Sequence, residues 1–172
     1  MSAAVFVSTI AGARAQTYDC TSGGGAIVDA GYDGSLQSMT CCTAEVPAGE
    51  CTVADLDVAI GISGHTFVGD LTLKVGSPAG TVTTLMSIPG GEELADDGTA
   101  GSGRGANWLS DVITFDDDAG DPSAEDMGVN LTSSQSVCAD NGVCAHTPAP
   151  GAGPGTSLAD FDGANSSGTW MV

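Results

Sequence analysis

The feature that most constrains the fold is a two-residue hydrophobic rhythm between residues 53 and 86. Within residues 52–62, apolar positions alternate with polar or small ones, which is the period of a half-buried strand. One face would carry Leu56, Val58, Ile60 and Ile62, and the other Asp55, Asp57 and Gly61. The alternation resumes over residues 71–76. It is followed by a turn, in which Pro78 presets φ and Gly80 suits the fourth position, and by a returning apolar arm over residues 81–86. The sequence therefore predicts a strand followed by a hairpin.

Composition extends this prediction to the whole chain. The 172 residues include 26 Gly and 7 Pro, and 15% of positions are charged, which argues against long helices and favours many short strands joined by turns. Further strands are expected over residues 107–115 and 168–172, and long irregular loops over residues 87–106 and 133–155. A chain of this length supports one compact domain with a substantial core. We therefore expect an all-β fold in which Trp108 and Trp170 are core residues.

The net charge of the chain argues against some classes of binding partner. Three Lys and Arg stand against 22 Asp and Glu, for a formal net charge of −19. Phosphate recognition depends on clustered Lys and Arg, so this balance argues against binding to nucleic acid or anionic lipid. No stretch approaches the ~20 apolar residues of a membrane helix, so no membrane span is predicted.

The first fifteen residues are typical of the end of a secretory signal. They are nearly uncharged, and Ala13-Arg14-Ala15 has the small-x-small pattern that signal peptidase accepts, although a basic region before the apolar stretch is missing. We interpret residues 1–15 as a signal peptide, the alternative being an apolar strand. The mature protein would then be secreted or held at the cell surface. It would begin at Gln16 with a Cys-rich segment, residues 16–50, that packs on a sandwich formed by residues 51–172.

Six cysteines fit an oxidising compartment. Cys138 and Cys144 flank a turn-rich run and are the expected local pair. The pairing of the other four stays open, because six cysteines allow fifteen connectivities; they are Cys20, Cys41, Cys42 and Cys51. The neighbours Cys41 and Cys42 are expected to have different partners. Zinc is the weaker alternative, since no Cys-x-x-Cys or Cys/His quartet is present.

The sequence gives little support for a catalytic site. His65 or His146 could serve as the base of a Ser-His-Asp triad, but no Gly-x-Ser-x-Gly elbow or other nucleophile context accompanies them. Paired carboxylates for glycoside hydrolysis would need aromatic sugar platforms, and the chain has few aromatic residues. We expect no catalytic residues and no bound organic cofactor.

Calcium is a more serious hypothesis. Asp116, Asp117 and Asp118 are adjacent, and Asp70 could approach them across the end of a sheet, which would supply the hard oxygen ligands that Ca²⁺ prefers. No EF-hand spacing is present. The competing interpretation is a solvated acidic surface that keeps the protein soluble. Both interpretations stay open at this point.

Three separated blocks carry a resemblance to a known family. The first contains Asp57-Val58-Ala59-Ile60, then residues 65–73 (HTFVGDLTL), then Ser77-Pro78-Ala79-Gly80-Thr81. The second contains Asn107-Trp108 and the run 114–119 (TFDDDA), and the third contains residues 158–163 (LADFDG) and Gly168-Thr169-Trp170. In this order, the blocks resemble the P domain, also called P/Homo B, which follows the subtilisin-like catalytic domain in proprotein convertases and many bacterial proteases. The resemblance covers roughly residues 53–172 and leaves out the Cys-rich first third and the Cys138/Cys144 loop.

The resemblance implies a jelly-roll β-sandwich, galactose-binding-like, of about eight strands and without catalytic residues of its own. In that family the module packs against the serine protease domain, stabilises it and modulates its response to calcium and pH. The expected function is thus docking to a protease or other partner domain. A free-standing secreted adhesin or carbohydrate-binding jelly roll is the alternative.

The chain departs from the family pattern in two ways. It contains no subtilisin-like catalytic domain, and the pattern continues past Gly168-Thr169-Trp170 with the rest of that strand, a turn and one more strand. The interpretation is a truncated sequence that lacks the last strand. The alternative is addition of a partner strand at the unpaired C-terminal edge.

Overall fold

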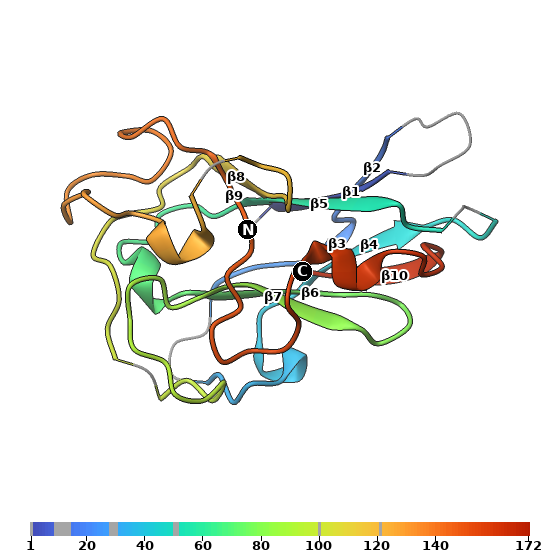
Figure 1. Ribbon diagram of the computed structural model, residues 1–172, viewed down its shortest axis with the longest axis horizontal. Helices are drawn as coiled ribbons and strands as arrows, with labels where there is room; N and C mark the ends of the chain where they lie inside the picture. The colour runs from blue at the N-terminus through green and yellow to red at the C-terminus, as the bar shows by residue number, and fades with distance from the viewer. Residues whose placement is uncertain (1, 9–14, 28–30, 50–51, 100, 121) are drawn as a thin grey trace.

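The computed structural model describes residues 2–8, 15–27, 31–49, 52–99, 101–120 and 122–172. In these residues the chain forms ten strands and four short 3₁₀ helices (Figure 1). The strands are β1 (Ser2–Ser8), β2 (Gln16–Asp19), β3 (Ser22–Gly23), β4 (Cys42–Val46), β5 (Asp55–Gly61), β6 (Thr72–Gly76), β7 (Val82–Ser87), β8 (Val112–Phe115), β9 (Ala145–His146) and β10 (Gly168–Met171). The 3₁₀ helices are η1 (Leu36–Ser38), η2 (Val68–Asp70), η3 (Ala124–Asp126) and η4 (Leu158–Phe161). The prediction of an all-β fold is confirmed.

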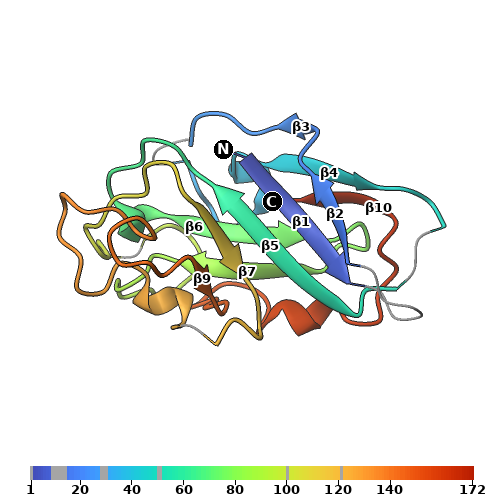
Figure 2. The same cartoon turned by 90° about the horizontal axis from the view of Figure 1, so that it is seen from above.

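The strands form two five-stranded sheets. The first has the order β2-β1-β5-β8-β9 and the second the order β3-β4-β10-β6-β7. Figures 1 and 2 show them as two layers, with β1 and β5 crossing over β6 and β7. All pairings between neighbouring strands are antiparallel except that of β8 with β9, which is parallel. The described residues therefore form ten strands where about eight were expected.

The core lies between the two layers and is built from the predicted alternation. Leu56, Val58 and Ile60 of β5 are fully buried, and Ile62 follows them on the same face. Trp108 and Trp170 are buried as well, as expected. Burying a large apolar side chain of this kind contributes roughly 1.5–3 kcal/mol, so these positions carry much of the stability.

The predicted hairpin is present as β6 and β7. The Ser77–Gly80 turn closes with a hydrogen bond from the Gly80 amide to the Ser77 carbonyl, 3.0 Å long, and Gly80 has φ +88°, a conformation that favours glycine. The predicted strand over residues 107–115 is shorter than expected. Regular pairing there is confined to β8, while Asn107 and Trp108 form isolated bridges to Ser136 and His65. The loops predicted over residues 87–106 and 133–155 are largely irregular, with β9 inside the second.

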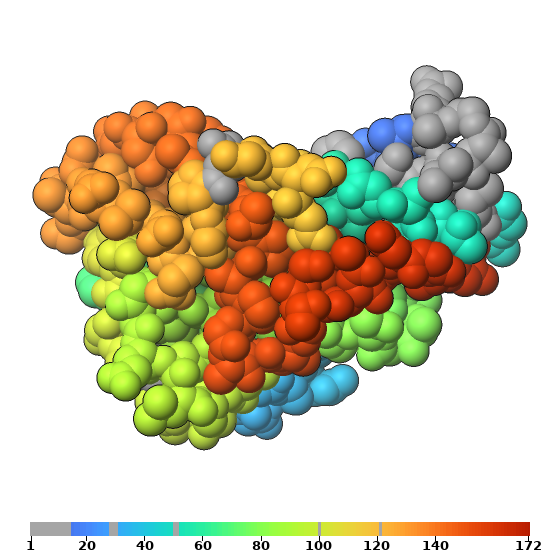
Figure 3. Space-filling view, in the orientation of Figure 1, coloured from blue at the N-terminus to red at the C-terminus, as the bar shows by residue number. Residues whose placement is uncertain are grey.

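The N-terminal third contributes strands to both sheets. Residues 16–50 supply β2 to the first sheet and β3 and β4 to the second. The backbone of residues 2–8, within the predicted signal peptide, forms β1 between β2 and β5. The rest of that segment lies mostly outside the described residues, so the signal peptide stays a prediction. Figure 3 shows that the chain from about residue 120 onwards, orange to red, covers much of one face of the molecule.

Candidate functional site

A buried ion pair lies on the side of the second sheet that faces away from the core. Along β6, Leu73 and Val75 point into the core, so Lys74 between them points to the opposite face. Its ammonium group is nevertheless fully buried. Nζ donates a hydrogen bond to Oδ2 of Asp96 at 2.5 Å and another to the Gly34 carbonyl at 2.7 Å. Because the charge is paired and hydrogen-bonded, β6 can hold a lysine that is removed from water.

Tyr32 completes this cluster. Its hydroxyl donates to Oδ1 of Asp96, and Nζ of Lys74 lies 5.1 Å from the centre of its ring. Burial, and next the hydrogen bond to Asp96, raise the pKa of Tyr32 far above its ordinary value, so the phenol stays protonated. The Lys74 clamp, meaning Tyr32, Gly34, Lys74 and Asp96, thereby ties two separate segments of the chain to one strand.

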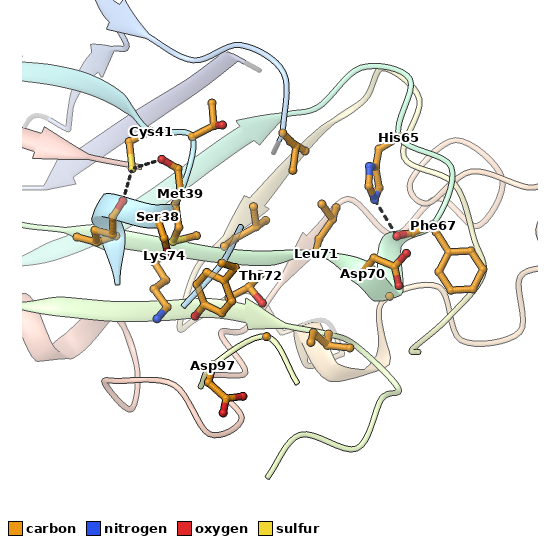
Figure 4. Close-up of a pocket in the computed structure, with 18 of the residues that line it drawn as sticks. Ser38, Met39, Cys41, His65, Phe67, Asp70, Leu71, Thr72, Lys74 and Asp97 are labelled. Atoms are coloured by element: carbon orange, nitrogen blue, oxygen red, sulfur yellow. Dashed lines mark hydrogen bonds between the residues drawn. The ribbon is translucent and has the colours of Figure 1, made fainter. Parts of the chain in front are cut away.

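A cavity of about 850 Å³ lies beside the clamp. Figure 4 shows it between the residues before β4, the start of β6 and the segment that contains η2. Its walls mix apolar and polar side chains, among them Met39, Cys41, His65, Phe67, Asp70, Leu71, Thr72 and Val172. The volume is within the range of ligand-binding pockets. Of the features found in the described residues, this cavity is the strongest candidate for a binding site.

Cys41 and His65 in the cavity wall both contact backbone carbonyl groups. Cys41 is the free thiol among the described residues, and its Sγ contacts the carbonyl groups of Leu36 at 3.4 Å and Met39 at 3.8 Å. Burial raises the pKa of Cys41, which favours the thiol over the reactive thiolate. His65 uses Nε2 to donate to the Phe67 carbonyl at 2.8 Å. The wall is therefore suited to binding by shape and hydrogen bonding.

The second histidine lies elsewhere. His146 of β9 is buried, and its Nδ1 lies 3.0 Å from the Pro122 carbonyl oxygen. The pairing of β9 with β8 places His146 opposite Phe115, in the first sheet, whereas His65 bridges to Trp108 and lines the cavity. The two histidines thus serve different regions.

The predicted acidic residues fall in two places. Asp116, Asp117 and Asp118 follow β8 next to the start of β5, whereas Asp70 ends η2 and lines the cavity near the other end of β5. Asp117 accepts from the amides of Leu158 at 3.0 Å and Ala159 at 2.8 Å. Its carboxylate therefore stabilises the start of η4.

The described carboxylates that were expected to bind calcium do not gather around one point. Asp116 accepts from the amide of Asp118 at 2.7 Å, so one of its oxygens closes a local turn. Within the described ranges, no three His, Cys, Asp or Glu side chains come together in a way that could hold a metal ion. The residues named for calcium thus do not form one cluster, and calcium binding stays a prediction without geometric support.

Carboxylates on the outer side of the first sheet form an acidic ladder, which we define as Asp55, Asp57, Asp116 and Asp118. Burial raises the pKa of Asp57 from 3.8 to about 6, with further contributions from Asp116 and Asp55. Its Oδ1 is buried without a hydrogen-bond partner among the described residues. Burial, and then Asp116, also raise the pKa of Asp55. The folded state therefore favours the protonated form of Asp55 and Asp57.

The disulfides follow the predictions in part. Cys138 and Cys144 are paired, as expected, and Cys42 is paired with Cys20. Cys41 is not bonded to its neighbour, as expected, but it is a free thiol rather than the member of a second disulfide. Cys51 lies outside the described residues. Two disulfides are typical of a protein that folds in an oxidising, extracellular environment.

Sequence reasoning missed the Lys74 clamp. A signal was present, because Lys74 is one of three basic residues in the chain and the alternation of β6 already placed it opposite the core. Its partner Asp96 comes from a Gly-rich loop, and Tyr32 from the segment before η1, where no pattern in the sequence indicates a contact.

Comparisons with known proteins add no neighbour. No protein-family model, curated protein or solved structure matches this chain. No helix in the described parts of the chain is long and apolar enough to cross a bilayer.

Proposed function

We propose that this chain is a secreted, non-catalytic β-sandwich module of the jelly-roll P/Homo B type, which docks to a subtilisin-like serine protease domain and stabilises it. Its contribution would be burial against the partner rather than chemistry. The partner supplies the catalytic residues, and this chain supplies a rigid, disulfide-containing surface.

The observation that carries the proposal is where the three resembling blocks lie in space. Val58 from the first, Trp108 and Phe115 from the second, and Phe161 and Trp170 from the third all belong to one buried cluster. The rings of Phe161 and Trp170 are 5.3 Å apart between centroids. Residues that are far apart in the sequence and quoted for one family thus form a single core. This supports the view that the resemblance reflects a shared packing plan rather than chance.

The same burial bears on the alternative. A carbohydrate-binding jelly roll needs exposed aromatic rings against which sugars can stack, but Trp108 and Trp170 are fully buried. No observation favours the carbohydrate-binding function over docking.

The proposal is tested by joining the chain to a subtilisin-like catalytic domain from the same genome. We expect the tandem protein to have a longer half-life of thermal inactivation than the catalytic domain alone, because burial against the module opposes unfolding. Trp170→Ala removes the buried ring from the third block and should abolish the protection, whereas Trp170→Phe should retain most of it. Equal half-lives with and without the intact module would refute the proposal.

Export is tested separately by sequencing the N-terminus of the protein recovered from the medium. We expect it to begin at Gln16. Recovery of the chain with residues 2–8 still attached would show instead that β1 remains in the folded protein.

A further inference from the structure

Lys74 is the one lysine in the sequence, and its amine is a nucleophile held out of water. Its side chain is fully buried, whereas most lysines of a folded protein keep the ammonium group in solvent. Desolvated lysines serve as nucleophiles in enzymes, because burial makes the neutral amine accessible. The docking function proposed above makes no use of this buried reactive group.

The carboxyl group of Asp96 is placed as an electrophile for this amine. Nζ lies 2.5 Å from Oδ2 of Asp96, so the carbon of that carboxyl group is one bond beyond the hydrogen bond. Tyr32 donates a hydrogen bond to the other oxygen, Oδ1, and the carbonyl of Gly34 accepts from Nζ at 2.7 Å. Both reacting groups are therefore fixed by further contacts. Such positioning accelerates an intramolecular reaction, with effective concentrations of about 10⁵–10⁸ M in well-oriented cases.

These contacts suit the formation of an amide bond between Lys74 and Asp96. A proton first passes from Nζ to Oδ2 along the hydrogen bond, which converts the ion pair into a neutral amine and a carboxylic acid. The nitrogen then attacks Cγ, and negative charge develops on Oδ1, where the hydroxyl of Tyr32 stabilises it as an oxyanion-hole donor does. The nitrogen passes a second proton to Oδ2, the Cγ–Oδ2 bond breaks, and Oδ2 leaves as water. The ammonium and the carboxylate thus become one amide and one water molecule, and the step balances without a co-reactant.

Burial also favours the product. In water, hydration of the ammonium and carboxylate groups opposes their condensation, but here the two side chains have exposed fractions of only 0% and 16%. An amide has no charge, so its formation removes the cost of keeping an ion pair inside the protein. Its N–H can still donate to the carbonyl of Gly34, and its carbonyl oxygen can still accept from Tyr32.

We propose that Lys74 and Asp96 join in an intramolecular isopeptide bond after the chain has folded. The bond links β6 of the second sheet to the loop after β7, across 22 residues of sequence, and adds a covalent link to the two disulfides. The chain folds with the ion pair, and the amide replaces it slowly, so newly refolded protein still carries both charges. This modification belongs to the chain itself and does not depend on a docking partner.

Digestion with trypsin tests the bond directly, because the sequence offers cleavage sites only after Arg14, Lys74 and Arg104. The full chain is recovered unfolded, refolded in a glutathione buffer and kept for one week at neutral pH. It is then reduced, alkylated and digested under denaturing conditions. A free Lys74 gives the separate fragments 15–74 and 75–104. An isopeptide bond blocks cleavage after Lys74, so we expect most of the protein to give one fragment, 15–104, that is lighter by one water molecule than its sequence predicts. Full cleavage after Lys74 in the folded wild type would overturn the proposal.

The digest also separates the bond from an imide at Asp97-Gly98, which would lose the same mass. An imide leaves Lys74 free, so loss of water together with cleavage after Lys74 would overturn the proposal as well. Lys74→Arg is the matched control, because it keeps the positive charge but has no nucleophilic amine. This variant should be cleaved after residue 74 and should keep its full mass.

The role of Tyr32 is tested by the rate of bond formation after refolding. Tyr32→Phe removes the donor to Oδ1; since loss of one oxyanion-hole donor slows acyl transfer about 10²–10³-fold, we expect the half-time to lengthen at least about tenfold. Tyr18→Phe is the matched control, since Tyr18 is the other tyrosine of the chain and donates to Gln16 instead. Its half-time should equal that of the wild type. Equal half-times for the two variants would contradict the assigned role of Tyr32, and if Tyr32→Phe does not fold, the digest of the wild type decides.

Discussion

The outer sides of the two sheets handle charge in opposite ways. On the second sheet, Lys74 is fully buried but is paired with Asp96 and hydrogen-bonded to Gly34. On the first sheet, Asp57 is partly buried among carboxylates of the same sign, and one of its oxygens has no hydrogen-bond partner among the described residues. Both positions follow from the same alternation, since each residue sits between core-facing neighbours on a central part of its sheet.

The difference teaches what a covering segment does for a strand residue. The segment that contains Tyr32 and the loop that contains Asp96 close over Lys74 and supply an opposite charge and an acceptor. In the acidic ladder the neighbours of Asp57 carry the same charge instead, and burial together with these carboxylates raises the pKa of Asp57. The stability of the outer side of the second sheet is therefore expected to depend on specific partner residues. That of the first sheet is expected to depend on pH and salt.

The largest expected effect comes from removing the partner of Lys74. Asp96→Asn leaves a buried ammonium group without an anion, so the free energy of unfolding at pH 7 should fall by about 3 kcal/mol in urea titrations. The double variant Lys74→Met with Asp96→Asn removes both charges and should recover most of that loss. A change below about 0.5 kcal/mol for Asp96→Asn would show that the clamp resembles a surface ion pair.

The disulfide between Cys20 and Cys42 should come next. Cys20 follows β2 of the first sheet and Cys42 begins β4 of the second, so this bond links the two layers across 22 residues of sequence. Chain entropy gives about 3 kcal/mol for a loop of this size. Replacing both cysteines by Ser should lower the stability by about this amount. Replacing Cys138 and Cys144, which are separated by 6 residues, should cost less, about 2 kcal/mol. The reverse order would show that loop closure is not the main contribution.

The comparison also separates what the sequence could predict from what it could not. Local patterns predicted β5, the hairpin of β6 and β7, the buried tryptophans and the Cys138–Cys144 bond, because each depends on neighbours close in the chain. The Lys74 clamp and the cavity beside it depend on segments that meet only after folding, so no spacing in the sequence indicates them. The calcium hypothesis shows the same limit, since Asp70 and Asp116 lie near opposite ends of β5.

A smaller effect is expected from pH at the acidic ladder. The pKa of Asp57 is about 6 in the folded protein and 3.8 ordinarily, so between these values the folded state binds more protons than the unfolded state. Its contribution to stability is therefore present below about pH 4 and is lost as pH rises through 6. Asp57→Asn should raise the melting temperature at pH 8 and leave it nearly unchanged at pH 4. Because the group is partly exposed, we expect on the order of 1 kcal/mol after solvent screening. A larger gain at pH 4 than at pH 8 would contradict this assignment.

The smallest effect sharpens the comparison by using salt. Repulsion within the acidic ladder is screened when the Debye length falls from about 10 Å at 0.1 M salt to about 3 Å at 1 M. At pH 8, 1 M NaCl should therefore raise the melting temperature of the wild type more than that of Asp57→Asn, by about 1 °C, since a few tenths of a kcal/mol shift the midpoint by that much in a chain of this size. The wild type and Asp57→Asn differ in charge at one site only. The difference between their salt-induced rises in melting temperature therefore removes the general effect of salt on a chain with a net charge of −19. The double variant Lys74→Met with Asp96→Asn is the complementary control: the ion pair it removes is buried and screened little, so its salt response should match that of the wild type. If Asp57→Asn responds to salt as strongly as the wild type, the raised pKa of Asp57 reflects burial alone, and repulsion between the carboxylates contributes nothing measurable.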